Sequence, residues 1–188
     1  CYEGMDDISF EYIFKKTISN INEKFKPQAI VLQGGTDSMS GDRLGCFNLS
    51  VKGHSIGTRF VKTLGVPFIM LGGGGYTLRN VPRAWTYESG LALGIDLDDE
   101  MPQHAYLEYF HPEKKLHMPV SNMENVNTPE YLNSILEQID NHLKNIHISN
   151  PDLNVNQSYV NPSIVKDYHP KDKEQEYHSF IHSAREKE

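Results

Sequence analysis

The stretch Val31-Leu-Gln-Gly-Gly-Thr-Asp-Ser-Met-Ser-Gly-Asp-Arg-Leu-Gly45 decides how the rest of the chain is interpreted. An apolar run, Ala29 to Leu32, leads into paired glycines and then into a carboxylate, Asp37. Short apolar runs that end at glycine are typical of strands buried on both faces of a parallel sheet, and ligands bind beyond the carboxyl ends of such strands. Asp37 therefore lies where chemistry is expected.

A second apolar run ends in the same way. Val66-Pro-Phe-Ile-Met-Leu71 is followed by four glycines, Gly72 to Gly75, and then at once by Tyr76. Such a glycine run indicates a sharp turn or a close approach of another group, because a Cβ would collide there. We expect the two strand ends to meet at one crevice that offers a carboxylate and a phenol.

The composition narrows the class of protein. The 188 residues include 18 Lys and Arg against 25 Asp and Glu, and this formal charge of −7 argues against broad binding to nucleic-acid phosphates. Cys1 and Cys46 are the only cysteines, so neither a disulfide framework nor a thiolate zinc cluster is expected, and a reducing intracellular setting fits best. No secretory signal or bilayer-spanning apolar run is present, which predicts a soluble protein.

Apolar periodicity and capping residues predict the helices. Apolar residues recur every three or four positions from Asp7 to Phe25, with Asp6 or Asp7 as the N-cap. Further helices are predicted over 48–64, 80–94 and 128–146, the last with apolar residues on one stripe, and 97–126 is irregular. Together with the two strands, this order predicts an α/β fold with a right-handed crossover and a parallel sheet. Beyond Asn150 a solvated polar tail is expected, with a short helix near Lys173 to Arg185 as an alternative.

Several candidate site residues have a simpler structural interpretation. Asp37 is either a turn residue or a hard oxygen ligand for a divalent metal, whereas Asp42 is better explained as a loop carboxylate that pairs with backbone amides or an arginine. Tyr76 is either a half-buried aromatic or a donor to a developing oxyanion. His54 is better explained as a packing or capping residue than as a ligand.

The usual cofactor motifs are incomplete in this sequence. The run from Gly72 to Thr77 does not complete Gly-x-Gly-x-x-Gly, and no Gly-Lys-Ser/Thr follows, so neither nucleotide-binding pattern is met. The nine histidines fall in no metal-binding spacing. A catalytic zinc needs about three protein ligands, and this sequence names one, Asp37.

Four motifs resemble the C-terminal half of the catalytic domain of a class I histone deacetylase. They are Leu32 to Leu49, Lys52-Gly-His54, Leu71 to Val81 and Trp85-Thr-Tyr-Glu88, and the resemblance runs from about Glu3 to His142. It implies the C-terminal portion of an arginase/deacetylase-like three-layer fold, a parallel sheet flanked by helices, over residues 1–149, with 150–188 as a separate polar tail.

The resemblance also implies an activity, the zinc-dependent hydrolysis of acetyl-lysine amides on histones and other proteins. Asp37 corresponds to a zinc ligand, and Tyr76 to the tyrosine that hydrogen-bonds the acetyl carbonyl. Gly73, Gly74 and Gly75 correspond to a bare backbone wall of the substrate tunnel, and Leu44 to a leucine at its mouth. In this family, zinc polarises the carbonyl and the attacking water, and a histidine pair moves the proton.

Partners and location follow from the same resemblance. Arg43 and Arg79 correspond to arginines that bind an inositol phosphate at a corepressor interface, the alternative being two exposed arginines. We expect acetylated histone tails and corepressor proteins as partners, transcriptional repression as the role, and the nucleus, with or without the cytoplasm, as the location. Direct DNA binding and membrane association are not expected.

The sequence also departs from the family pattern. Met39 replaces the second aspartate of two-metal relatives, so a single metal is expected, and Gly34 and Thr36 are small changes from cysteine and serine. The family's histidine pair, its Asp-x-His zinc ligands and its potassium sites all precede Cys1. The chain is therefore expected to be a fragment that lacks deacetylase activity alone, its remaining Zn²⁺ ligands and any K⁺ sites lying outside it. A non-catalytic module that binds corepressor or inositol phosphate stays an alternative, and a phosphate-binding fold is a more distant one.

Overall fold

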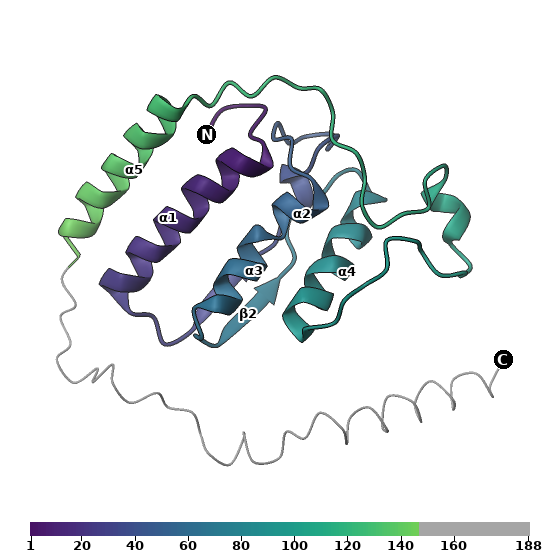
Figure 1. Ribbon diagram of the computed structural model, residues 1–188, viewed down its shortest axis with the longest axis horizontal. Helices are drawn as coiled ribbons and strands as arrows, with labels where there is room; N and C mark the ends of the chain where they lie inside the picture. Colours follow the sequence, from purple (N-terminus) through teal and green to yellow (C-terminus); the bar gives the residue numbers. More distant parts are fainter. Residues whose placement is uncertain (147–188) are drawn as a thin grey trace, which may run out of the picture. The chain divides into compact units, whose positions relative to one another are not determined.

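The computed structural model describes residues 1–146, whose elements are shown in Figure 1. The helices are α1 (Asp7–Phe25), α2 (Val51–His54), α3 (Ile56–Thr63), α4 (Asn80–Leu93) and α5 (Pro129–Lys144); the strands are β1 (Ile30–Gln33) and β2 (Phe68–Leu71); and two short 3-10 helices are η1 (Thr36–Ser38) and η2 (Leu107–Phe110). The tail beginning at residue 150, with its alternative short helix, lies outside the described residues.

The two strands form a parallel pair. Ile30 is in register with Phe68 and Gln33 with Leu71, and the chain passes from β1 to β2 through α2 and α3. The strands lie within two residues of their predicted positions. The parallel crossover expected from the sequence is therefore confirmed, and it brings the carboxyl ends of both strands to the same edge of the sheet.

The prediction that both strands are buried on both faces is wrong for the described residues. Their side chains alternate between half-buried and exposed. Val31 and Ile69, which are paired in register, are 65% and 60% exposed, and Leu71 is 48% exposed. Helix α3 packs against both strands and shields one face. The opposite face keeps an apolar row that the described residues leave uncovered.

Capping residues explain where the long helices begin and end. The Asp6 carboxylate accepts a hydrogen bond from the Ser9 amide and caps α1, and the Thr128 hydroxyl accepts one from the Tyr131 amide and caps α5. Gly94, with φ of 75°, ends α4 in the left-handed conformation that glycine tolerates. These helices match the sequence prediction closely.

The single helix predicted over 48–64 is divided into α2 and α3, which corrects that prediction. Ser50 caps α2 by accepting a hydrogen bond from the Gly53 amide, and the chain turns at Ser55, whose hydroxyl donates to the Lys52 carbonyl. The Asp7 carboxylate accepts hydrogen bonds from the amide and hydroxyl of Ser50 and leaves no room for a Cβ on Gly53. This anchoring to α1 fixes α2 as a short helix of its own.

Two apolar clusters hold these elements together. The first joins α1, α5 and the segment around Leu49, and its buried members are Met5, Ile13, Leu49, Leu132 and Leu136; α1 and α5 lie side by side in Figure 1. The second consists of Met39, Val51 and Ala84 and lies beside η1. Phe25 and Ile146, expected on the apolar stripes, are 55% and 43% exposed, because Phe25 is the last residue of α1 and Ile146 lies two residues beyond the end of α5.

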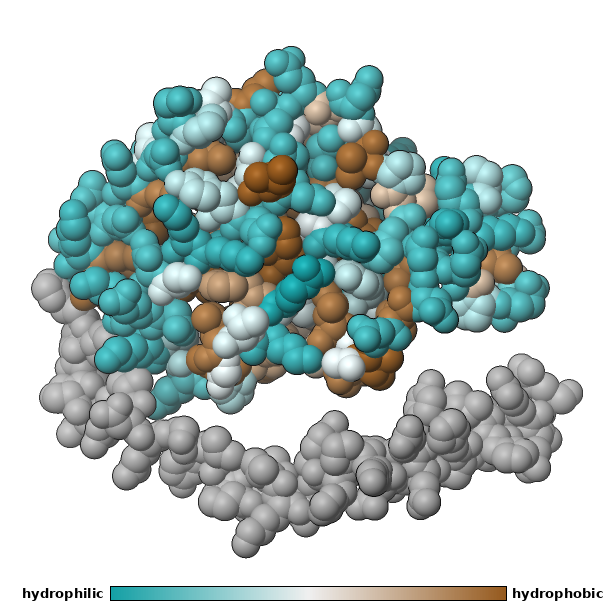
Figure 2. Space-filling view, viewed as in Figure 1, coloured by the Kyte–Doolittle hydropathy of each residue, from teal (hydrophilic) through white to brown (hydrophobic). Residues whose placement is uncertain are grey.

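The view in Figure 2 shows mainly hydrophilic residues with smaller hydrophobic patches between them. None of the helices in residues 1–146 combines the length and apolar composition that crossing a bilayer requires.

Candidate functional site

The carboxyl ends of β1 and β2 meet, as expected from the sequence. The Gly34 amide donates to the Leu71 carbonyl over 2.7 Å, and the Thr36 amide donates to the Gly74 carbonyl over 2.6 Å. A Cβ on Gly73 would lie 2.8 Å from the Cα of Gly35, so the two glycine loops touch backbone to backbone. Glycine is required here by close approach, and the two loops form one surface.

Asp37 lies on this surface, in the first turn of η1. Its half-buried carboxylate rests against Gly74, where a Cβ would collide with Oδ2, and a Cβ on Gly45 would collide with its backbone carbonyl. Within residues 1–146 no hydrogen-bond donor or cation contacts the Asp37 carboxylate. A carboxylate held in a fixed place with open coordination positions is suited to binding a divalent metal.

Asp42 joins the two loops, in agreement with its interpretation as a carboxylate that pairs with backbone amides. One oxygen accepts hydrogen bonds from the amides of Leu44 and Gly45, both over 2.9 Å, and the other accepts them from Tyr76 over 2.8 Å and Thr77 over 3.3 Å. Partial burial would raise the pKa of Asp42, but these amides outweigh it and lower the pKa below its ordinary value. Asp42 is therefore an ionised structural link.

Two exposed side chains stand beside this link. Tyr76 is 43% exposed and Leu44 is 73% exposed, and the backbone amide of each is held by Asp42. Gly75, with φ of 150°, leads directly into Tyr76 and packs against Thr36. The structure thus brings Asp37, Gly73 to Gly75, Leu44 and Tyr76 together around the ends of the two strands.

The two candidate arginines are not equivalent in the structure. Both are exposed. Arg79 lines a hollow of about 420 Å³ and donates to the His111 carbonyl over 3.3 Å. Arg43 is not among the residues that line this hollow. An anion site shared by both arginines stays a prediction.

Residues 1–146 contain no group of three His, Cys, Asp or Glu side chains placed to hold a metal ion. The role of Asp37 as a ligand of a metal whose other ligands lie elsewhere stays a prediction.

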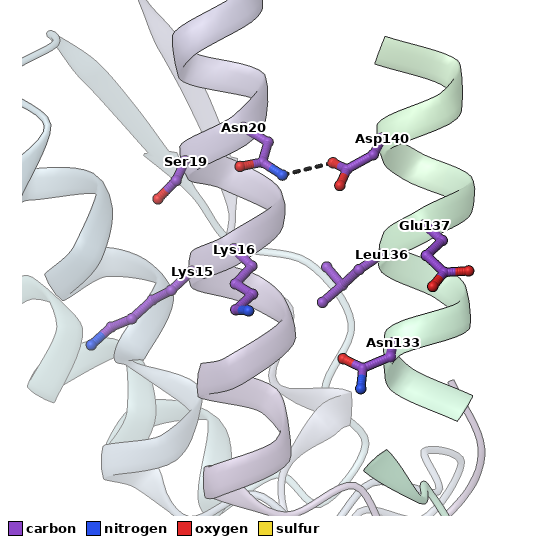
Figure 3. A pocket seen from close by; sticks show the side chains of 8 residues that line it. All are labelled: Lys15, Lys16, Ser19, Asn20, Asn133, Leu136, Glu137 and Asp140. Atoms are coloured by element: carbon purple, nitrogen blue, oxygen red, sulfur yellow. Dashed lines mark hydrogen bonds between the residues drawn. The ribbon is translucent and has the colours of Figure 1, made fainter. Parts of the chain in front are cut away.

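A hollow of about 520 Å³ lies elsewhere, and all of its lining residues come from α1 and α5. Figure 3 shows Lys16 and Asn20 on α1 facing Leu136 and Asp140 on α5, with a hydrogen bond of 2.7 Å from Asn20 to Asp140. This hollow, the polar seam between α1 and α5, is separate from the loops that carry Asp37 and Tyr76.

Sequence reasoning missed three polar residues beneath the site. His54, interpreted as a packing or capping residue, is buried and contacts both Gly35 and Glu88, while Trp85 bonds Gly34. Trp85 and Glu88 are three residues apart and share one face of the predicted helix, but their contacts with Gly34 and His54 join distant parts of the chain, and no local spacing reveals them.

Comparison with known proteins adds to this geometry. Residues 1–91 match the model of the histone deacetylase domain family. The chain is 54% identical over 144 residues to "Histone deacetylase clr6" of Schizosaccharomyces pombe, covering 77% of this chain and 36% of that protein. It is 53% identical over 142 residues to "Histone deacetylase 1" of Homo sapiens and to "Histone deacetylase HDAC1" of Drosophila melanogaster, covering 76% of this chain and 30% and 27% of those proteins.

The chain thus spans about a third of the length of these curated relatives. The helices and parallel strand pair of residues 1–146 agree with part of the arginase/deacetylase α/β fold. The match begins at residue 1 and includes the loops of Asp37 and Tyr76, so the surface at the strand ends lies inside the matched region. By its sequence, the chain belongs to the histone deacetylase family.

Proposed function

We propose that the chain contributes one wall of a zinc-dependent lysine deacetylase site, which hydrolyses acetyl-lysine amides on histones and other proteins. One observation carries this proposal: the uncontacted Asp37 carboxylate lies against Gly74, two residues from an exposed tyrosine. A metal ligand and a phenol on adjoining loops can together polarise a carbonyl and stabilise the oxyanion that forms during amide hydrolysis.

Each residue has a defined part in this chemistry. Bound Zn²⁺ would supply Lewis-acid activation, and Asp37 would hold it. The Tyr76 hydroxyl would donate a hydrogen bond to the acetyl oxygen as negative charge develops there. Gly73, Gly74 and Gly75 would let the flat amide approach the backbone, and Leu44 would shield the aliphatic part of the lysine from water.

The decisive experiment uses the complete product of the reading frame that contains residues 1–188. Tyr76→Phe should lower kcat on an acetyl-lysine peptide by about 10²–10³-fold, because it removes one donor to the developing oxyanion, while zinc content stays at the wild-type level. Asp37→Asn should lower zinc content as well as activity.

Unchanged turnover by Tyr76→Phe would contradict the proposed role of the phenol. Binding to a corepressor or inositol phosphate by a complete product that never hydrolyses acetyl-lysine would favour the non-catalytic alternative.

The isolated 188-residue chain provides a separate test. With one ligand named, we expect no tight zinc in equilibrium dialysis and no turnover of an acetyl-lysine peptide. One tightly bound zinc that Asp37→Asn loses would mean that the chain holds further ligands, and the assignment would then be redrawn around them.

The wider role is part of the same proposal. We expect nuclear repressor complexes and acetylated histone tails as partners, and only the histone part of this expectation has support, from the name histone deacetylase that the relatives carry. We further propose that Arg43 and Arg79 bind an inositol phosphate. Inositol hexakisphosphate should then bind the complete product with an affinity that falls as salt rises, and Arg79→Gln should weaken it. Equal binding by Arg79→Gln would remove this arginine from the site.

A further inference from the structure

A buried polar cluster lies beneath the glycine pair that precedes Asp37. It consists of His54 at the end of α2, Thr58 on α3 and Glu88 on α4, which are 7%, 0% and 2% exposed. Ionisable side chains are rarely buried to this degree unless they are paired. The chemistry proposed above uses none of the three.

The His54 ring contacts oxygen atoms on both sides. Nε2 lies 2.8 Å from the Gly35 carbonyl oxygen, and because a carbonyl only accepts, Nε2 carries a proton. Nδ1 lies 3.2 Å from Glu88 Oε1, an ion-pair contact rather than an aligned hydrogen bond. Burial alone would lower the pKa of His54, but Glu88, the Gly35 carbonyl and the charge of Asp37 together raise it. These contacts thus favour the protonated ring by more than burial disfavours it.

Glu88 is committed to this cluster. Thr58 donates a hydrogen bond to its Oε1 over 3.0 Å. Its Oε2, which has no hydrogen-bond partner in the described part of the chain, lies beneath Gly34, where a Cβ would approach it to 3.1 Å. The carboxylate is therefore wedged between the His54 ring, 3.2 Å away, and the glycine loop.

The cluster and Trp85 fix two consecutive carbonyls. Trp85 Nε1 donates to the Gly34 carbonyl over 2.7 Å, from one turn before Glu88 on α4, while His54 holds the next carbonyl from α2. Glycine has no side chain to restrict its backbone, so a Gly-Gly pair keeps one conformation only when other groups hold it. Asp37 follows Gly35 by two residues and inherits that conformation.

We propose that the buried His54–Glu88 pair positions Asp37 as a metal ligand by holding the Gly35 carbonyl. This inference rests on the proposed function. His54 and Glu88 are positioning residues, since they contact the backbone of the loop and neither substrate nor metal. Groups that orient a metal ligand affect metal affinity even though they do not touch the metal.

The first test measures zinc affinity in the complete product by competition with a chelator. Glu88→Gln keeps the size of the side chain and an acceptor for Thr58 but removes the charge that holds His54. It should weaken zinc binding by about 10–100-fold. Leu132→Ala, in the core between α1 and α5, is the matched control: it should lower stability and leave zinc affinity at the wild-type value.

The second test needs no metal. In the 188-residue chain, Glu88→Gln and His54→Gln should speed hydrogen exchange of the Thr36 amide, which donates to Gly74, relative to the amides of α1. Leu132→Ala should change the exchange rates of the Thr36 amide and of the α1 amides by the same factor. If a single variant fails to fold, the double variant His54→Gln with Glu88→Gln removes both buried charges at once and carries the test.

The outcomes separate this inference from the function on which it rests. A wild-type complete product that neither binds zinc nor hydrolyses acetyl-lysine overturns the proposed function, whatever the exchange rates are. A wild-type product that does both, with a Glu88→Gln variant that retains wild-type zinc affinity and Thr36 exchange, overturns the positioning role alone.

Discussion

Gly74 shows how little space surrounds the candidate metal ligand at the scale of single residues. Its backbone lies against the Asp37 carboxylate, and its φ is not among the positive values that restrict a position to glycine. The requirement for glycine here is therefore steric, set by one neighbouring side chain. A single added methyl group is enough to test whether the position of Asp37 matters.

We predict that Gly74→Ala displaces Asp37 and lowers both zinc retention and deacetylase activity of the complete product, because its Cβ would occupy the space of the carboxylate. Gly57→Ala on α3 is the control. Its Cβ would meet Phe14 at an ordinary 3.4 Å, and alanine favours helix by about 1 kcal/mol over glycine. Zinc analysis and peptide turnover of both variants check this; equal zinc content in both would contradict it.

Asp42 gives a second prediction at this scale. Asp42→Asn would present an NH₂ group to amides that already donate, so the free energy of unfolding should fall by about 1–3 kcal/mol, the usual loss for a charge-assisted hydrogen bond. Urea unfolding of the 188-residue chain measures the difference. The matched variant is Asp96→Asn, an exposed acidic residue for which no such change is expected.

The pH dependence of this difference follows from the lowered pKa of Asp42. A carboxylate with a folded pKa below its unfolded value stabilises the fold above the unfolded pKa of about 3.9, and that contribution is lost as pH falls through the folded pKa. The gap between wild type and Asp42→Asn should therefore be full near neutral pH and shrink below about pH 4. A gap that stays constant down to about pH 3 would rule out this origin.

At the scale of elements, α5 depends on one apolar stripe against α1. Leu132 and Leu136 are buried in the cluster with Met5 and Ile13, whereas the hydrogen bonds from Asn20 to Asp140 and from Tyr12 to Asn133 are exposed. Exposed polar pairs contribute little to stability, and buried apolar side chains contribute most of it. The helix is therefore held by its stripe rather than by the polar seam.

We predict that Leu132→Ala lowers the free energy of unfolding by about 2–5 kcal/mol, because it leaves a cavity in the core that α1 and α5 share. Gln138→Ala, exposed on the same helix, should change it by less than about 0.5 kcal/mol. Thermal and urea unfolding of the two variants compare them. Equal losses would mean that α5 is held by something other than this core.

The elements also show what the sequence could and could not predict. Asp6, Gly94 and Thr128 have the capping functions expected of them, because a cap depends on bonds within a few residues. The break between α2 and α3 depends on Asp7, more than forty residues away in sequence, and no local periodicity reveals it. The same limit hid the contact of His54 with Glu88, which joins α2 to α4 across the fold. The sequence could place Asp37 near Tyr76 because the glycines beside them indicate that the two backbones approach each other closely.

At the scale of the described molecule, the sheet is apolar on a face that is left open. Val31, Ile69 and Leu71 form a row that is roughly half to two-thirds exposed, and parallel sheets are ordinarily covered on both faces. The relatives are more than twice as long as this chain, so a longer protein of this family has further residues available to cover the row.

We predict that this exposed apolar face causes the isolated 188-residue chain to self-associate. Ile69→Thr keeps a β-branched strand residue and removes apolar surface, so it should reduce self-association in light scattering while leaving the unfolding midpoint nearly unchanged. Lys62→Thr, exposed on the helix side, is the control for a general surface change. If Ile69→Thr self-associates as strongly as the wild type, the surface responsible lies elsewhere.

The pairing of β1 with β2 has one more consequence. Within residues 1–146 this sheet consists of these two strands, so each strand has one paired side and one side whose backbone N–H and C=O groups still point outward. Such an edge is a template that accepts any extended segment of suitable shape. A separately produced peptide in an extended conformation could pair with either side, extend the sheet by one strand and satisfy these backbone groups.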